Sequence, residues 1–286
     1  RKLMPVFITG NDLTLSDICN VAHNFEKVEL TDSAKQKVDN CRAYVEKIIR
    51  DNRVVYGLTT GFGKFSTVRI DTDQIEELQE NLILSHATGV GVNLSIPETR
   101  AVMLLRINVL AKGHSGIRLS TLQTLIDMLN ARIHPCLPEK GSVGASGDLA
   151  PLSHLALVLL GKGEAEYKGR IIPGKLAMKK AGIAPVKLKA KEGLALNNGT
   201  QVMTAVASLS YLKARDLVMQ ADIIAALSID ALLGTASAFD PLVHKLRPHS
   251  GQIASAANLK KLLENSQLNC SHENCENVQD AYSIRC

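Results

Sequence analysis

The sequence lacks tryptophan entirely, and its five tyrosines and five phenylalanines make up only 3% of the 286 residues. Ala, Leu and Ile side chains must therefore fill the core, which favours closely packed helices over a β-sandwich. No apolar run reaches the ~18 residues that a membrane span needs. The N-terminus also lacks the charged and apolar regions of a secretory signal. We therefore expect a cytoplasmic protein with no membrane partner.

Basic clusters and cysteine motifs are also missing. The formal net charge is only +5, and no cluster of Lys and Arg is interleaved with aromatic residues, so we expect no nucleic-acid partner. The six cysteines are scattered. Cys270, His272 and Cys275 lie close together in the sequence, but no second C-x-x-C or H-x3-H pair completes a zinc site. We expect reduced thiols and no bound metal.

Helical periodicity is the main pattern that is present. A capping residue at Thr31 or Asp32 precedes apolar residues at helical spacing, such as Val38 and Val45. The proline-free segment from Gly193 to Gly234 predicts a helix of ~35 residues, about 50 Å long. Further helices are expected at about residues 73–87, 97–112, 120–132, 147–160 and 252–264.

Short strands are expected near the N-terminus, at residues 5–10 and 27–30. Thr14 and Asp17 lie between them with the spacing of a capping box. The alternating segment around Lys168-Gly169 predicts a small hairpin.

These elements predict a mainly α fold in two regions. Residues 1–198 form a small mixed region with short strands, and this region leads into a long-helix bundle. Residues 199–286 are expected to start that bundle without completing it, as helices of this length belong to bundles.

The segment GSVGASGDLA, residues 141–150, places four small residues directly ahead of an apolar helix. It fits none of three common loop motifs. Asp148 stands where a nucleophile elbow needs glycine, no lysine follows the glycines as in a phosphate loop, and the dinucleotide pattern G-x-G-x-x-G is absent. A plain helix start, with Asp148 near the positive end of the helix dipole, explains the pattern.

A second interpretation gives the backbone itself a chemical role. Gly147 has no Cβ, so its amide nitrogen can approach the carbonyl carbon of Ala145. Attack there closes a five-membered ring through Ser146, and loss of one water from the ring and one from the Ser146 hydroxyl leaves an exocyclic methylene. Such a group is an electrophile made without an external cofactor. The residues alone leave both interpretations open.

The surrounding segments resemble those of the aromatic amino-acid ammonia-lyase/aminomutase family, which builds 4-methylidene-imidazol-5-one from Ala-Ser-Gly. The resemblance spans nearly the whole chain and is greatest to members that act on histidine. It implies that Ala145, Ser146 and Gly147 form this group. The similar segments are GSVGASGDLAPLSHLALVLLGKGEA, YGLTTGFGKF, NLILSHATGVG, LLRINVLAKGHSGI, KEGLALNNGTQ, QADIIAALSIDALLGT, LRPHSGQI and VQDAYSIRC.

The resemblance also implies roles for three residues of the first region. Tyr56 would remove the β-proton of the substrate, although a tyrosine with an ordinary pKa of ~10 must be activated for this. His86 would contact the substrate ring, and its position near a helix end equally suits a partner of the helix dipole. Asn198, selected over Asn197 by its N-G-T-Q context, would lie near the prosthetic group. It could also be a plain turn residue before glycine. Gln201 is a weaker candidate.

Gln279, Tyr282 and Arg285 are the candidates near the C-terminus. Offsets of three and six place them on roughly one face of a helix, where they could simply be polar surface. The resemblance implies that Arg285 captures the substrate carboxylate, for which a planar guanidinium is suited. We assign no catalysis to His154, which we expect to be a satisfied core histidine. Asp148 assists ring closure or caps its helix.

The resemblance implies an amino-acid substrate and a homotetramer whose sites combine residues of several subunits. Members of the family are considerably longer than this chain. We therefore expect an N-terminal fragment with an incomplete site, little activity alone and a linear Ala145-Ser146-Gly147. Two alternatives stay open: a tyrosine or phenylalanine ammonia-lyase or aminomutase, and a non-catalytic helical assembly module.

Overall fold

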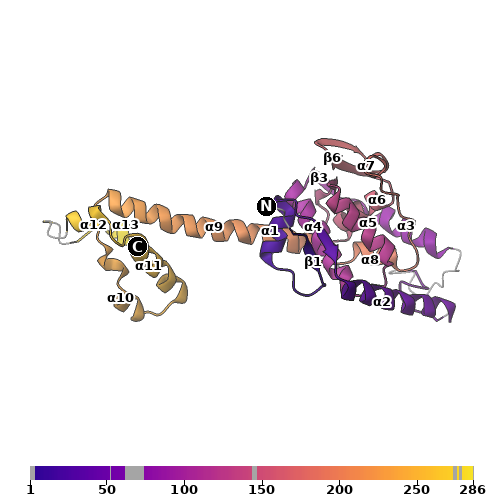
Figure 1. Cartoon of the computed structure of the whole chain (residues 1–286), viewed down its shortest axis with the longest axis horizontal. Coiled ribbons are helices and arrows are strands. Elements are labelled where there is room, and N and C mark those ends of the chain that lie inside the picture. The colour runs from indigo at the N-terminus through magenta and orange to yellow at the C-terminus, as the bar shows by residue number, and fades with distance from the viewer. Residues whose placement is uncertain are drawn as a thin grey trace. The chain divides into compact units, whose positions relative to one another are not determined.

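The computed structural model describes residues 4–51, 53–61, 74–143, 147–272, 276 and 279–285, except for the side chain of Arg285. The chain divides into two compact units, Arg1–Leu209 and Ser210–Cys286, which are described separately. Most elements are helices (Figure 1), so the predicted mainly α fold is confirmed. The boundary at residues 198 and 199 stays a prediction.

The first unit begins with the two expected strands. β1 (Val6–Ile8) pairs in parallel with β2 (Val28–Leu30), and α1 (Leu15–His23) connects them. The predicted capping box is present, because Thr14 Oγ1 accepts from the Asp17 amide at 3.2 Å and Asp17 Oδ2 accepts from the Thr14 amide at 2.9 Å. A reciprocal pair of this kind satisfies two backbone donors that the helix cannot use.

Helices fill most of the first unit, as the periodicity predicts. Thr31 caps α2, since its side chain accepts from the Ala34 amide. α4 packs against α1 and α5, and α6 packs against α3 and α8. These contacts bury α4 and α6 almost completely. The helices are α2 (Asp32–Arg50), α3 (Ile75–His86), α4 (Ile96–Ala111), α5 (Leu119–Asn130), α6 (Leu149–Leu159), α7 (Gly174–Ala181) and α8 (Glu192–Asn197).

Two small antiparallel sheets complete this unit. β3 (Val90–Asn93) pairs with β5 (Pro138–Lys140), and β6 (Glu164–Tyr167) lies between β4 (Ile133–Pro135) and β7 (Arg170–Pro173). The hairpin predicted around Lys168-Gly169 is confirmed. Both of its turn residues have positive φ, 54° and 80°, as a two-residue turn that matches strand twist requires.

A buried carboxylate fixes α8 against α5. Glu192 is fully buried, and its oxygens accept from Arg118 Nη2 at 2.6 Å and from Thr121 Oγ1 at 2.7 Å. A buried charge needs such partners, because an unpaired one would be strongly destabilising. These bonds therefore hold the segment that leads into the loop at Asn198.

The long helix is confirmed as α9 (Gln201–Ala231), which spans about 46 Å. In the second unit, the helix expected at 252–264 is α11, and a small core gathers around Ile229 and Phe239. In the described part of the chain, no helix is both long and apolar enough to cross a bilayer. The remaining elements are the 3-10 helix Ala236–Phe239, α10 (Pro241–Lys245), α11 (Ser250–Leu262), α12 (Gln267–Ser271) and α13 (Tyr282–Arg285).

Candidate active site

The loop of small residues ends at Gly147, which the structure describes; Ala145 and Ser146 lie outside the described residues. Gly147 has φ of +104°, a conformation that residues with a Cβ rarely adopt. A Cβ on Gly147 would lie 2.8 Å from both the backbone nitrogen and the backbone oxygen of Gly199. Glycine is thus required here by conformation and by the close approach of a second backbone.

Asp148 joins this loop to the start of α9. Its amide donates to the carbonyl of Gly199 at 2.6 Å, and its carboxylate is fully buried. Carboxylate Oδ2 accepts from the amides of Val202 at 2.9 Å and Met203 at 3.0 Å, while Oδ1 accepts from Ser142 Oγ at 2.5 Å. The carboxylate therefore occupies the position of an N-cap group for α9, where a negative charge is favoured.

This geometry revises the expected role of Asp148 as a cap of its own helix. Asp148 is the N-cap residue of α6, but its side chain makes no capping bond there. The carboxylate is instead used by another helix that begins some fifty residues later in the chain, at Gln201. Whether Asp148 also assists ring closure stays a prediction.

Arg106, on α4, holds the segment that runs from α8 to the start of α9. Its Nη1 donates to the carbonyl of Asn198 at 3.0 Å and to Gln201 Oε1 at 2.5 Å, and its Nη2 donates to the carbonyl of Ala195. Burial lowers the pKa of Arg106 to about 10, so the guanidinium stays charged at neutral pH. A rigid fork of donors can hold several carbonyls in one arrangement.

Asn197 and Asn198 point into different surroundings. Asn197 is buried and donates from Nδ2 to Ser153 Oγ at 3.2 Å, whereas Asn198 is exposed. Two buried polar atoms of this cluster, Asn197 Oδ1 and Arg106 Nε, have no hydrogen-bond partner among the described residues. Buried polar atoms without partners are rare and mark sites where a further group can bind.

Two other candidates lie on separate segments of the first unit. Tyr56 lies in the turn after α2 and is 58% exposed. His86 ends α3, and its Nδ1 lies 2.9 Å from the carbonyl of Leu82 and 3.1 Å from Ser85 Oγ. This position fits the interpretation that His86 interacts with backbone carbonyl groups at the C-terminal end of its own helix. A substrate contact stays a prediction for both residues.

The second unit holds the three remaining candidates. Gln279 lines a hollow of about 480 Å³ together with His244 and Asp280. Tyr282 is exposed at the start of α13, and Arg285 is the last residue of that helix. The grouping of these residues with those of the first unit in one site stays a prediction.

His154 behaves as the structural histidine expected from the sequence. Its Nε2 accepts from the amide of Gly89 at 3.0 Å. Burial lowers the pKa of His154, which keeps the imidazole neutral and able to accept this bond. The bond ties α6 to the start of β3.

Arg106 and the capping role of Asp148 were missed by sequence reasoning. An arginine in the apolar run LLRINVL indicates a buried charge that needs partners, so Arg106 could have been noticed. The use of Asp148 by α9 had no local signal, because its partners are more than fifty residues away.

Comparison with known proteins identifies the family of this chain. Residues 13–286 match the model of the aromatic amino acid lyase family. The chain is 54% identical to a histidine ammonia-lyase of Alkaliphilus oremlandii over 284 residues, 99% of this chain and 56% of that one.

Solved structures of the same family are also similar to this chain. A histidine ammonia-lyase of Trypanosoma cruzi is similar at a TM-score of 0.87 with 39% identity, over 99% of this chain and 52% of that one. A phenylalanine aminomutase of Pantoea agglomerans is similar at a TM-score of 0.89 with 36% identity, over 98% of this chain and 57% of that one. The chain thus spans little more than half the length of these proteins. It belongs to the aromatic amino acid lyase family.

Proposed function

We propose that this chain carries the electrophile-forming part of a histidine ammonia-lyase, which converts histidine to urocanate and ammonia. The observation that supports this most strongly is the identity of 54% to a histidine ammonia-lyase across 99% of the chain. The hydrogen bonds from the Val202 and Met203 amides to Asp148 also hold the residue that follows Gly147 at the start of α9.

The described residues fit a prosthetic group formed from Ala145, Ser146 and Gly147. The backbone of Gly147 lies so close to Gly199 that no side chain fits between them, and Asn197 Oδ1 is a buried acceptor without a described partner. Once formed, a methylidene-imidazolone supplies an electrophile that activates the substrate amine for departure. No external cofactor is needed.

The protein residues would bind the substrate and move its proton. In this proposal Tyr56 removes the β-proton, Arg285 pairs with the substrate carboxylate, and His86 contacts the substrate imidazole. Asn198, whose carbonyl is held by Arg106, keeps its exposed side chain available near the prosthetic group. We also assign substrate-binding roles to Gln279 and Tyr282.

We further propose that the active form is a homotetramer. The part of α9 in the second unit exposes Leu217, Val218, Ile224 and Leu227, each more than 60% accessible. A row of large exposed apolar side chains on one helix indicates a surface that another protein surface covers. Because relatives are nearly twice as long as the segment matched here, we expect little lyase activity from the 286 residues alone.

A second candidate of the same chemistry is an aminomutase. The similarity to the phenylalanine aminomutase, with a TM-score of 0.89, favours it. A tyrosine or phenylalanine ammonia-lyase stands beside it, and a non-catalytic helical assembly module would have no turnover at all.

A chimera separates these candidates. In this chimera, residues 1–286 are joined to the C-terminal part of the Alkaliphilus oremlandii relative that lies beyond the matched segment. The chimera is supplied in turn with histidine, tyrosine and phenylalanine, and the products are analysed. The proposal predicts urocanate and ammonia in equal amounts from histidine. A β-amino acid product supports the aminomutase, and no product from any of the three substrates contradicts lyase chemistry. Ser146→Ala in the chimera is the control and should reduce urocanate to background.

A further inference from the structure

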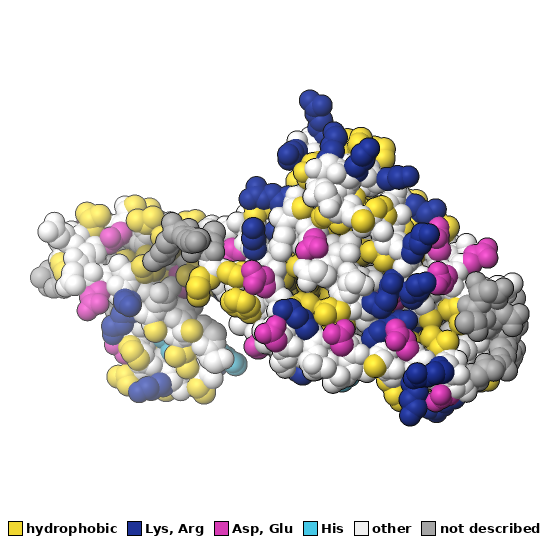
Figure 2. Space-filling model, turned by 45° about the vertical axis from the view of Figure 1, so that its right-hand side comes forward, with side chains coloured by type: hydrophobic (Ala, Val, Ile, Leu, Met, Phe, Trp, Pro, Cys, Tyr) yellow, Lys and Arg dark blue, Asp and Glu magenta, His cyan; other side chains and the backbone are white. Residues whose placement is uncertain are grey.

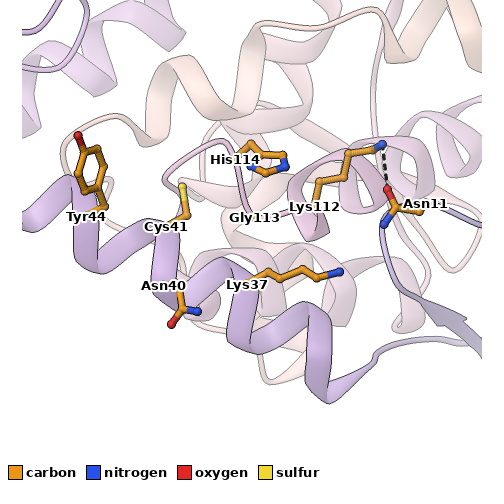
Figure 3. Close-up of a pocket in the computed structure, with 8 residues that line it drawn as sticks. All are labelled: Asn11, Lys37, Asn40, Cys41, Tyr44, Lys112, Gly113 and His114. Atoms are coloured by element: carbon orange, nitrogen blue, oxygen red, sulfur yellow. Dashed lines mark hydrogen bonds between the residues drawn. The ribbon is translucent and has the colours of Figure 1, made fainter.

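A hollow of about 600 Å³ lies on the first unit, at segments that the proposed lyase chemistry does not use. Its size is that of a small-molecule pocket. One wall is a face of α2, a second is the loop between β1 and α1, and a third is the loop after α4 (Figure 3). The residues that line it are Asn11, Lys37, Asn40, Cys41, Tyr44, Lys112, Gly113 and His114.

The walls are held together by close backbone contacts. Gly113 has φ of +75°, and a Cβ on it would lie 2.6 Å from the backbone carbonyl of Lys37. Gly10 has φ of +94°, and a Cβ there would lie 2.9 Å from the backbone nitrogen of Lys112. Two glycines thus let the loops pack directly on α2 and on each other, which makes the hollow a preformed part of the fold.

Two lysines give one end of the hollow its positive charge. Figure 3 shows the ammonium groups of Lys37 and Lys112 at the same end, and Lys112 Nζ donates to Asn11 Oδ1 at 3.2 Å. Among the described residues, Lys37 Nζ has no hydrogen bond or ion pair, and no Asp or Glu lines the hollow. An anion bound at this end of the hollow would be attracted by both ammonium groups.

Some other lysines of this unit have acidic partners, whereas others, such as Lys47, have none among the described residues. Lys35 pairs with Asp32 at 2.8 Å, and Lys162 pairs with Glu80 at 3.0 Å. Figure 2 shows Asp and Glu side chains beside Lys and Arg over the lower part of the first unit, whereas its upper part carries mainly Lys and Arg. The hollow combines two such cations in one concave site, with no carboxylate among its lining residues.

The far end of the hollow is suited to a flat organic group. Tyr44 follows Lys37 by seven residues on the same face of α2, about 10 Å along the helix axis. Its ring is 56% exposed and lies beyond Cys41, on the side away from the two ammonium groups (Figure 3). An accessible aromatic face of this kind can stack on a planar ligand.

We propose that this hollow binds a small phosphate monoester, with the phosphate between Lys37 and Lys112 and a flat organic part along Cys41 and Tyr44. A phosphate carries a charge of nearly −2 at neutral pH, which matches two ammonium groups better than a single carboxylate does. Lysine binds phosphate as a point charge, and the side-chain amide of Asn11, which lies beside Lys112 in Figure 3, supplies a further hydrogen-bond donor. This site is independent of the proposed lyase activity.

Protection of Cys41 from alkylation tests the proposal with a local readout. The 286-residue chain reacts with N-ethylmaleimide, with and without phenyl phosphate, and the modification of each cysteine is followed by peptide mass spectrometry. Saturating phenyl phosphate should slow the alkylation of Cys41 at least about fivefold. Cys270, which is exposed in the second unit, should react at an unchanged rate. Added salt should weaken the protection.

Matched variants identify the cause of the protection. The double variant Lys37→Gln/Lys112→Gln should remove it, whereas Lys47→Gln, an exposed lysine on the last turn of α2, should keep it. Benzyl alcohol, which has the ring without the phosphate, should not protect Cys41. Absence of protection by phenyl phosphate, equal protection by benzyl alcohol, or protection that is insensitive to salt would overturn the proposal.

Discussion

The amide of Asp148 donates to the carbonyl of Gly199 at 2.6 Å, and this bond joins the end of the Ala-Ser-Gly loop to the residue that follows Asn198. Two segments that are distant in sequence thereby form one structural unit. The carboxylate of Asp148 strengthens the junction by capping α9.

Asp148→Ala should destabilise the first unit strongly. The change leaves the buried amide of Val202 and the partly buried amide of Met203 without an acceptor, which should lower the free energy of unfolding by about 2–4 kcal/mol. Urea unfolding measures this. Thr31→Ala, which removes an ordinary N-cap from α2, is the control and should cost about 1 kcal/mol. Equal losses in the two variants would contradict the special role of Asp148.

Gly147→Ala tests the close approach of the two backbones. The new Cβ meets Gly199 at 2.8 Å and also requires a positive φ, so the free energy of unfolding should fall by roughly 2–4 kcal/mol. Gly182→Ala has the same sign of φ but no atom within 4 Å of its Cβ. That variant isolates the conformational cost and should lose only about 1 kcal/mol. If both variants unfold at the same urea concentration, the contact with Gly199 is not tight.

Arg106→Met should affect both stability and turnover. It removes the donors to the carbonyls of Ala195 and Asn198, which should cost about 3 kcal/mol. Arg42→Met is the matched control, because Arg42 donates to the carbonyls of Gly116 and Ala190 in another part of the unit. Both variants are also made in the chimera, and kcat for urocanate formation is measured on the fraction that stays folded. Only Arg106→Met should lower this kcat. An equal loss of kcat in both variants would make Arg106 a purely structural residue.

His154 should make stability dependent on pH. Burial lowers the pKa of His154 in the folded protein, whereas an unfolded histidine titrates near ~6.5. Between these pKa values the unfolded chain binds more protons, so stability should fall as the pH drops below ~6.5. His154→Gln, which can still accept from the Gly89 amide, should lose less stability than the parent between about pH 7.5 and about pH 5.5. His23→Gln, on the surface, should behave as the parent does, and a His154→Gln variant with the parent's pH dependence would refute this explanation.

The sequence was sufficient where the determinants are local. The capping box of Thr14 and Asp17, the hairpin at Lys168-Gly169 and the long helix α9 all follow from short-range patterns, and each is present. β3 was not predicted, because it has only four residues, one of them glycine, and all four are exposed. The capping of α9 by Asp148 depends on chain segments that meet only in the folded protein, so a single sequence holds no local sign of it.

The candidate site was predictable only in part for the same reason. GSVGASGD and its flanking segments predicted the family, and the family model matches residues 13–286. Geometry added what similarity could not: the need for glycine at position 147 and the support that Arg106 gives to Asn198.

The state of Ser146 in the 286-residue chain is a separate question. Ring closure needs compression of the backbone from Ala145 to Gly147, and we expect that a complete subunit is required to provide it. We therefore predict that this chain alone keeps the linear tripeptide and shows little lyase activity. Intact mass spectrometry checks this, and a mass lower than that of the sequence by two water molecules would refute it.

The most direct test of the account is the mass of the tryptic peptide from Gly141 to Lys162 in the chimera that converts histidine. If Ala145, Ser146 and Gly147 form the electrophile, this peptide should be lighter than its sequence by two water molecules, and the Ser146→Ala peptide should keep its full mass. A full-mass peptide from a chimera that produces urocanate would contradict the central claim.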